Sequence, residues 1–178
     1  MTTSNRDHEA LKRRAVAIHE AAHSVVFYRA SGEWPMPVTI EPDPARRSLG
    51  ASNNTSDSFD EKAQEELVLS LYAGGHAARR LDPSCGDEGC ASDEAKAEGV
   101  LSYWGWESRE SEFRDRSRAL VDEFWDQIMA VGDQLLIDAT LTAVEVYFIV
   151  EQVAGNTEEP DLETYRRSRG DPRVASRQ

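Results

Sequence analysis

Two histidines four positions apart, with a glutamate directly after the first, constrain this chain more than any other feature. The segment reads His19-Glu20-Ala21-Ala22-His23 and lies in an apolar, alanine-rich stretch. Residues four apart lie on one face of an α-helix, so a helix here would point both imidazoles at one metal ion. Glu20 would lie beside the first imidazole, where a carboxylate can take a proton from water. This spacing is typical of zinc-dependent peptidases, and it requires a helix around it.

The surrounding residues predict that helix and several others. Residues 6–30 are rich in alanine, Ser4 or Asn5 can cap the segment, and Gly32 lies just beyond its end. Short β-prone runs at 38–40 and 48–51 follow. Two further helices are predicted at about 59–80 and 142–153, and each opens with a capping box, at 58–61 and at 142–145. Two more are predicted at about 92–103 and at 111–131, and Gly132 interrupts or ends the latter. The predicted class is mainly α with a small β element.

Length and composition indicate one globular domain followed by a polar tail. The chain has 178 residues, of which 39% are hydrophobic and 30% charged, so it is long enough to bury a substantial core. The residues from Gly155 onward are polar and include Pro160 and Pro172, and we expect them to be flexible. The predicted organisation is a folded domain over residues 1–154 and a tail over residues 155–178.

The charge balance argues against two classes of partner. The net charge is −13 at pH 7, whereas binding to nucleic acid or to an anionic membrane depends on Lys and Arg. The longest apolar run, 144–153, is interrupted by two glutamates and is too short to span a bilayer. Residues 1–7 are polar with no apolar stretch behind them, so we expect no signal peptide. With Cys85 and Cys90 as the only cysteines, we expect a cytoplasmic protein with reduced thiols.

A third metal ligand must come from elsewhere in the chain, because a catalytic zinc site usually has three protein ligands and one position for water. His8 lies about three turns before His19 on the same predicted helix, too far away to share an ion. His76 falls on another predicted helix and remains a candidate. Glu65 and Glu66 would suit a different class of His-Glu-x-x-His protease. Spacing alone does not choose among His76 and the many carboxylates.

Several further segments resemble the protease domain of the FtsH family, the membrane-anchored, AAA-linked zinc proteases. The order and approximate spacing of these segments hold from about residue 12 to residue 153. Beyond the histidine motif they are Val38-Thr39-Ile40-Glu41-Pro42 with Ser48-Leu49-Gly50, residues 71–78, Gly89-Cys90-Ala91-Ser92-Asp93, residues 102–106, and Leu135-Leu136 with Thr140-Leu141 and Glu145. The resemblance implies an FtsH-protease-like helical zincin fold with a small β element.

The resemblance also implies roles for individual residues. Asp93 would be the third Zn²⁺ ligand beside His19 and His23, and Glu20 would be the general base. A groove would lie beside the β element, where an extended peptide adds as a strand. The residues implied to bind substrate along that edge are Val38, Thr39 and Ile40, or Leu49 and Gly50 in the segment 48–51.

The chain departs from the FtsH pattern in ways that bear on activity. The ATPase module and the membrane anchor have no counterpart in the sequence, and no Gly-x-x-x-x-Gly-Lys phosphate loop is present. Arg79 and Arg80 follow Ala78, where the family has an acidic residue that could orient a ligand. We therefore expect the chain to act on flexible or unfolded segments, unless a separate unfoldase or adaptor supplies substrate.

The predicted function is a zinc-dependent metalloendopeptidase whose partner is a peptide or an unfolded protein, with neither nucleic acid nor membrane involved. A homo-oligomer is compatible with this prediction, because FtsH-type protease domains assemble as six-membered rings. The alternative is a metal-binding module with little or no hydrolytic activity that captures peptides or proteins. The missing motor and the lost acidic residue favour that alternative, and the intact Glu20 argues against it.

Overall fold

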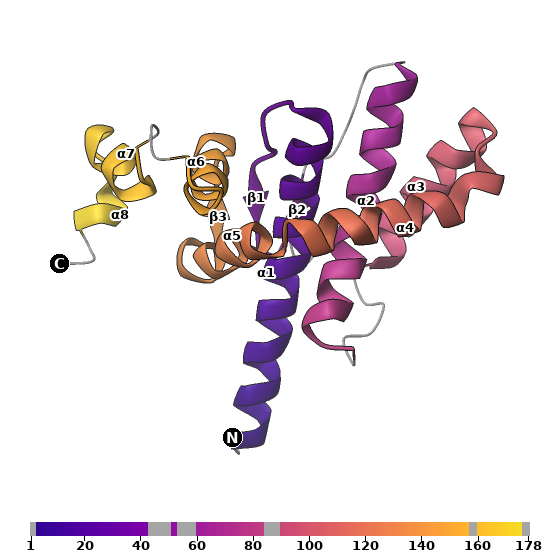
Figure 1. The fold of residues 1–178 in the computed structure, drawn as a ribbon. Coiled ribbons are helices and arrows are strands. Elements are labelled where there is room, and N and C mark those ends of the chain that lie inside the picture. The colour runs from indigo at the N-terminus through magenta and orange to yellow at the C-terminus, as the bar shows by residue number, and fades with distance from the viewer. Residues whose placement is uncertain (1–2, 43–50, 53–59, 84–89, 157–159, 176–178) are drawn as a thin grey trace.

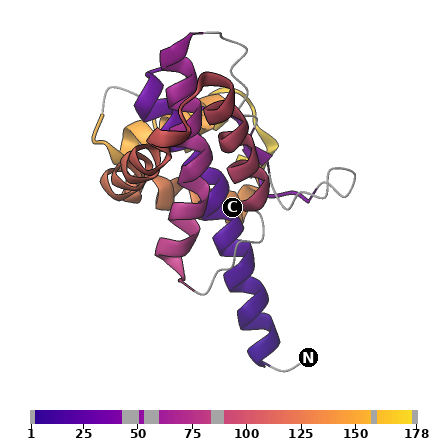
Figure 2. The ribbon, with the colours of Figure 1, turned by 90° about the vertical axis from the view of Figure 1, so that its right-hand side faces the viewer.

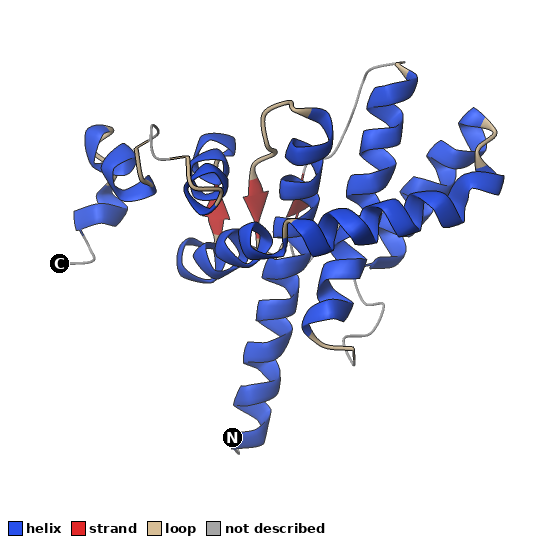
Figure 3. Cartoon of the chain, viewed as in Figure 1, coloured by secondary structure: helices blue, strands red, loops and turns tan. Residues whose placement is uncertain are grey.

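Helices account for most of the chain in the computed structural model, which describes residues 3–42, 51–52, 60–83, 90–156 and 160–175 (Figures 1 and 3). The helices are α1 (Thr3–Ser31), α2 (Glu61–Leu81), α3 (Cys90–Trp104), α4 (Glu110–Glu123), α5 (Trp125–Asp138), α6 (Ala143–Val153), α7 (Leu162–Ser168) and α8 (Pro172–Ala175), with a 3-10 turn, η1, at Glu107–Arg109. The strands are β1 (Val38–Thr39), β2 (Ala51–Ser52) and β3 (Thr140–Leu141). The predicted mainly α class with a small β element is confirmed.

The centre of the molecule is the pair α1 and α2, which pack along one another (Figure 1). The helices α4 and α5 run across this pair, with α4 on α2 and α5 on α1, while α3 packs on α2. The first turns of α1 project away from the body, and residues 7–13 are exposed (Figure 2). Among the described residues, no helix combines the length and the apolar character needed to cross a bilayer.

Small residues let other helices approach α1 closely. Ala17, Ala21 and Ala22 are fully buried on α1, and at one such approach Gly132 of α5 lies against Ile18, where a methyl group would overlap the isoleucine side chain. The prediction that Gly132 ends or interrupts a helix is therefore wrong. The predicted helix 111–131 instead breaks at Phe124, between α4 and α5.

The two predicted capping boxes have different outcomes. At the start of α6, the Thr142 hydroxyl accepts from the Glu145 amide at 3.3 Å, and the Glu145 carboxylate accepts from the Thr142 amide at 2.8 Å, so this box is confirmed. The prediction that the capping box at 58–61 begins the next helix is wrong. Ser58 lies outside the described residues, and α2 begins at Glu61 with Asp60 as its N-cap, whose carboxylate accepts from the Ala63 amide.

The three strands form one small antiparallel sheet in the order β2-β1-β3. Val38 lies opposite Ser52 on one side and Leu141 on the other. Ser24, directly after the histidine motif, donates from its hydroxyl to the Met36 carbonyl at 2.7 Å and so ties the approach to β1 onto α1. The short run predicted at 38–40 is confirmed as a strand over Val38–Thr39, and the sheet is held next to the helix that carries the motif.

The strand β3 was not predicted, since the sequence led us to expect β structure only at 38–40 and 48–51. The helix α5 ends because Ala139 adopts a left-handed conformation (φ 61°). Its carbonyl then accepts a hydrogen bond from the Ile40 amide at 2.8 Å, which directs the following residues along β1.

The segment predicted to be a flexible tail instead contains α7 and α8, and this corrects the expected boundary at residue 154. Leu162 and Arg166 of α7 are buried. The Arg166 guanidinium pairs with Asp138 at 2.8 Å and with Glu145 at 2.6 Å, so α7 is fastened to the end of α5 and to α6. Composition alone indicated a solvated segment because nothing in it identifies Arg166 as a buried residue.

Candidate metal centre

The three residues predicted to bind zinc lie together, although two come from α1 and one from α3. The Nε2 atoms of His19 and His23 are 3.0 Å apart, and the Asp93 Oδ2 atom lies 3.1 Å from each. All three side chains are buried. Among the described residues, they form the one group of three or more His, Cys, Asp or Glu side chains whose ligand atoms are close enough to share a metal ion.

A glycine on α2 makes room for this arrangement. A Cβ atom at Gly74 would lie 2.6 Å from the His23 Nε2 atom and 2.8 Å from the His19 Nε2 atom. Any other residue would therefore push a methyl group into the space that the two imidazoles share. The contact between α1 and α2 at this point requires glycine because of the closeness of the rings.

The His23 ring is oriented by a hydrogen bond on its far side. Its Nδ1 atom donates to the Ser70 carbonyl at 2.7 Å, and the Ser70 hydroxyl donates to the His23 carbonyl at 2.9 Å. With its proton on Nδ1, the neutral ring presents the lone pair of Nε2 to His19 and Asp93. Metal-binding histidines usually donate their second nitrogen to a carbonyl or a carboxylate, which fixes the ring and its tautomer.

Asp93 reaches the histidines from the first turn of α3. Its Oδ2 atom faces both imidazoles, and its Oδ1 atom accepts from the Lys96 ammonium at 3.1 Å. Lys96 is one turn further along α3, at the spacing where an aspartate and a lysine meet on a helix surface. The lysine therefore holds one carboxylate oxygen while the other is directed at the histidines.

The three groups influence one another's protonation. Burial raises the pKa of Asp93, but its hydrogen bonds to His19 and His23 outweigh burial, so the pKa lies well below its usual range. Burial lowers the pKa of His23, but the hydrogen bond to Asp93 and the charges of Asp93 and Glu20 outweigh it and raise the pKa. The protonation of His23 and the ionisation of Asp93 therefore favour each other. A divalent cation would take the place of the proton on His23.

Glu20 lies next to the three candidate ligands and is itself nearly buried. Burial raises the pKa of its carboxyl group above the ordinary value, against the opposing effect of His23 and His19. A divalent cation held by the neighbouring residues would act in the opposite direction and favour the ionised carboxylate. Glu20 is therefore placed to hold or release a proton close to whatever His19, His23 and Asp93 bind.

The donor set and its spacing fit zinc. Ligand atoms about 2.0–2.2 Å from a tetrahedral zinc ion lie roughly 3.3 Å from one another, and the observed separations are 3.0 Å and 3.1 Å. Two imidazoles with one carboxylate make three protein ligands, which leaves a fourth position for water or substrate. Imidazole and carboxylate ligands also suit other first-row divalent metals, so this donor set is compatible with zinc and with those metals.

The other candidates for a third ligand lie elsewhere. Glu65 pairs with Arg109 at 2.7 Å, and Glu66 is 3.4 Å from Lys62. His76 lines a separate cavity between α2 and α4. His8 lies on the exposed, projecting part of α1. Among the described candidates that the sequence left open, Asp93 is the one that the fold brings to the two histidines.

The predicted substrate edge is corrected in part. Val38 and Thr39 belong to β1, the middle strand, and Ile40 is bonded to Ala139, so a peptide cannot add there. Leu49 and Gly50 lie outside the described residues. Within the described part of the chain, the strand that borders the sheet on that side is β2, Ala51–Ser52, which overlaps the end of the predicted segment 48–51.

Three residues of the centre were missed by sequence reasoning: Gly74, Ser70 and Lys96. Two adjacent glycines, at 74 and 75, within an otherwise helical pattern are a signal that could have pointed to a close approach to α2, although they do not identify what approaches it. The three-residue spacing of Asp93 and Lys96 indicated a pair on one helix face. Nothing in the sequence identified Ser70, since its carbonyl is a backbone group that any residue would supply.

Metal analysis of the purified protein should test the centre directly. Protein prepared without a histidine tag or added metal should carry about one zinc ion per chain, and Asp93→Ala should lose it, because only two neutral imidazoles remain. Glu98→Ala, an exposed change on the same helix, should retain the metal. Zinc retained by Asp93→Ala would show that another residue is the third ligand.

No protein-family model matches the chain, and no curated protein matches it significantly. The likeness to FtsH proteases therefore remains a prediction from the motifs.

Proposed function

We propose that this chain is a zinc-dependent metalloendopeptidase that hydrolyses peptide bonds in flexible or unfolded protein segments. The observation that carries this proposal is the convergence of the His19 and His23 Nε2 atoms and the Asp93 Oδ2 atom within 3.0–3.1 Å, with the Glu20 carboxyl group beside them. A site that only stabilised the fold would need a fourth protein ligand rather than an adjacent carboxylate.

Each residue has a chemical task in this proposal. When bound, zinc supplies Lewis-acid chemistry, which polarises a carbonyl and activates water. His19, His23 and Asp93 hold the ion, with Ser70 fixing the His23 ring and Lys96 fixing Asp93. Glu20 accepts the proton of the attacking water at its carboxylate and then transfers it to the leaving amine, so it acts first as base and then as acid.

The nearly buried position of the site supports an extended substrate. His19 and Glu20 are each 8% exposed, so a folded protein surface cannot bring a peptide bond to them. An extended segment can add along β2, which borders the sheet that Ser24 ties to α1. Such strand addition supplies main-chain hydrogen bonds for any sequence. The choice of substrate would then depend on the flexibility of the segment more than on its side chains.

Replacing Glu20 with glutamine should separate catalysis from metal binding. We expect zinc-dependent cleavage of an unfolded protein such as casein to fall by at least about 100-fold, because a general base typically contributes 10²–10⁴-fold to the rate. The zinc content should stay unchanged, since Glu20 is not among the three grouped ligands. The measurements are gel-based cleavage rates with and without a chelator, together with metal analysis.

The matched control is Glu9→Gln, which makes the same chemical change at an exposed position on the same helix. It should cleave at the wild-type rate. Cleavage that survives in Glu20→Gln would contradict the role of Glu20. Zinc binding without cleavage in the wild type would support the alternative of a metal-binding module that captures peptides.

A further inference from the structure

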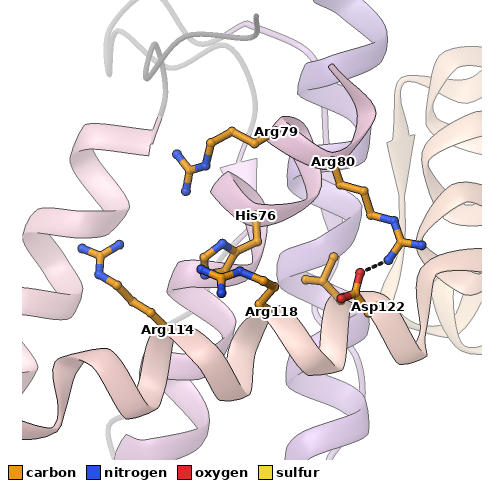
Figure 4. A pocket seen from close by; sticks show the side chains of 7 residues that line it. His76, Arg79, Arg80, Arg114, Arg118 and Asp122 are labelled. Atoms are coloured by element: carbon orange, nitrogen blue, oxygen red, sulfur yellow. Dashed lines mark hydrogen bonds and ion pairs between the residues drawn. The ribbon is translucent and has the colours of Figure 1, made fainter. Parts of the chain in front are cut away.

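A second site lies between α2 and α4, away from the metal centre. A cavity of about 380 Å³ opens there, and most of its lining side chains are basic although the chain carries a net charge of −13 (Figure 4). This size falls within the usual range for pockets that bind small molecules. The lining residues are His76, Arg79, Arg80, Arg114, Arg118, Val121 and Asp122.

The imidazole of His76 lies among the guanidinium groups of this cavity (Figure 4). Its Nε2 atom is buried and has no hydrogen-bond partner within the described part of the chain. Burial and the charges of Arg79, Arg118 and Arg114 lower the pKa of His76 to about 4. The ring is therefore neutral at physiological pH, and it has an unused polar atom close to several positive charges.

A second buried polar atom without a partner lies nearby. Tyr72, one helical turn before His76 on α2, is 2% exposed, and its hydroxyl has no hydrogen-bond partner among the described residues. Its ring lies 4.3 Å from the guanidinium carbon of Arg114. A face of α2 that leaves two polar atoms unpaired beside arginines is unusual, because buried polar groups in proteins are nearly always satisfied.

The acidic neighbours of these arginines neutralise the cavity only in part. Arg80 turns toward Asp122 and Trp125, and Arg79 has an interaction of its own. Arg114 pairs with Glu110 at 2.8 Å and with Glu94 at 3.4 Å. Arg118 pairs with Asp115 at 3.0 Å, but both side chains are more than half exposed, so water competes strongly for this contact. Arg118 therefore remains able to bind an anion, and Arg114 adds its positive charge to the cavity.

We propose that this cavity binds a small phosphate-bearing molecule, held by Arg114, Arg118 and His76. Phosphate oxygens match the fork of a guanidinium group and accept several hydrogen bonds at once, which a single carboxylate does less well. With the ring protonated under the influence of the bound anion, the unpaired Nε2 atom of His76 would donate to the same anion, and the remaining volume would hold the organic part of the molecule. The proposal does not depend on the metal centre, since the two sites share no residue.

Calorimetric titration with inorganic phosphate, pyrophosphate and adenosine monophosphate tests this site. At low salt we expect saturable binding with a stoichiometry of one, which Arg118→Gln weakens about tenfold or more, as expected for the loss of a charge-assisted contact. The matched control is Arg116→Gln, which makes the same charge change on α4 but at a residue that pairs with Glu65 and does not line the cavity. Tightest binding by the nucleotide would indicate a phosphate ester as the ligand, and equal binding of all three would indicate the anion alone.

Two further measurements establish that the anion binds in this cavity rather than at the metal centre. Titration of protein stripped of metal should give the same binding, because phosphate could otherwise coordinate an ion held by His19, His23 and Asp93. In NMR spectra, bound pyrophosphate should raise the pKa of His76 from its low value, since a bound anion favours the imidazolium. No saturable binding, equal weakening in Arg116→Gln and Arg118→Gln, or binding that disappears with the metal would each overturn the proposal.

Discussion

Replacing Gly74 with alanine should abolish metal binding, although glycine to alanine is among the smallest changes possible in a helix. The new methyl group would lie 2.6 Å from the His23 Nε2 atom and 2.7 Å from the His19 Cε1 atom. To relieve this overlap, either α2 must move away from α1 or both rings must turn out of the arrangement that brings them to Asp93. We expect zinc affinity to fall by more than about 100-fold, beyond the 10–100-fold typical of residues that only support ligands.

The stability of the metal-free protein should also fall, by about 1–3 kcal/mol, because overpacking strains a closely packed core. Gly99→Ala is the matched control. Gly99 lies on α3, and a Cβ atom there would meet no atom within 4 Å, so its replacement should raise helix stability by up to about 1 kcal/mol and leave zinc binding unchanged. The measurements are competition with a zinc chelator dye and thermal unfolding with and without zinc. Wild-type affinity in Gly74→Ala would mean that α2 does not lie against the imidazoles.

The residues of the metal centre that are close together in the sequence were predictable from their spacing, and the residues that are far apart were not. His19, Glu20 and His23 belong to one helix, so their spacing alone placed them together. Asp93 lies 70 residues beyond His23, and no periodicity connects the two; its role came from the resemblance of the segment 89–93. Gly74 and Ser70 act through the packing of α2 on α1, which depends on the whole fold and which one sequence does not encode locally.

The parts of the fold that were mispredicted share the same cause. Glycine lowers helix propensity, which predicts a break at Gly132, yet packing against Ile18 gives this residue a position inside α5. The strand β3 exists because Ala139 turns the chain toward β1, a left-handed conformation that alanine rarely adopts and that sequence patterns do not suggest. In each case a tertiary contact overrides the local preference.

Replacing Arg166 with methionine should produce the largest loss of stability in the chain. The Arg166 side chain is 3% exposed and pairs with Glu145 and Asp138, whose side chains are 2% and 4% exposed. Glu145 would keep Arg173 at 2.7 Å, whereas Asp138 would lose its pair with Arg166 at 2.8 Å. Breaking a buried ion pair by removing one partner costs about 3–5 kcal/mol. For a protein of this length, that loss corresponds to a fall in melting temperature of about 6–20 °C. Thermal unfolding followed by circular dichroism measures it.

The next residue along α7 provides the control. Arg167 pairs with Glu163 at 2.6 Å, but both side chains are more than 60% exposed, so Arg167→Met should cost less than about 1 kcal/mol. Adding Asp138→Asn to Arg166→Met should restore part of the loss, because it removes the buried negative charge whose ion pair with Arg166 is broken. If Arg166→Met is no more destabilising than Arg167→Met, then α7 does not dock on α5 and α6, and residues 155–178 behave as the solvated tail that their composition suggested.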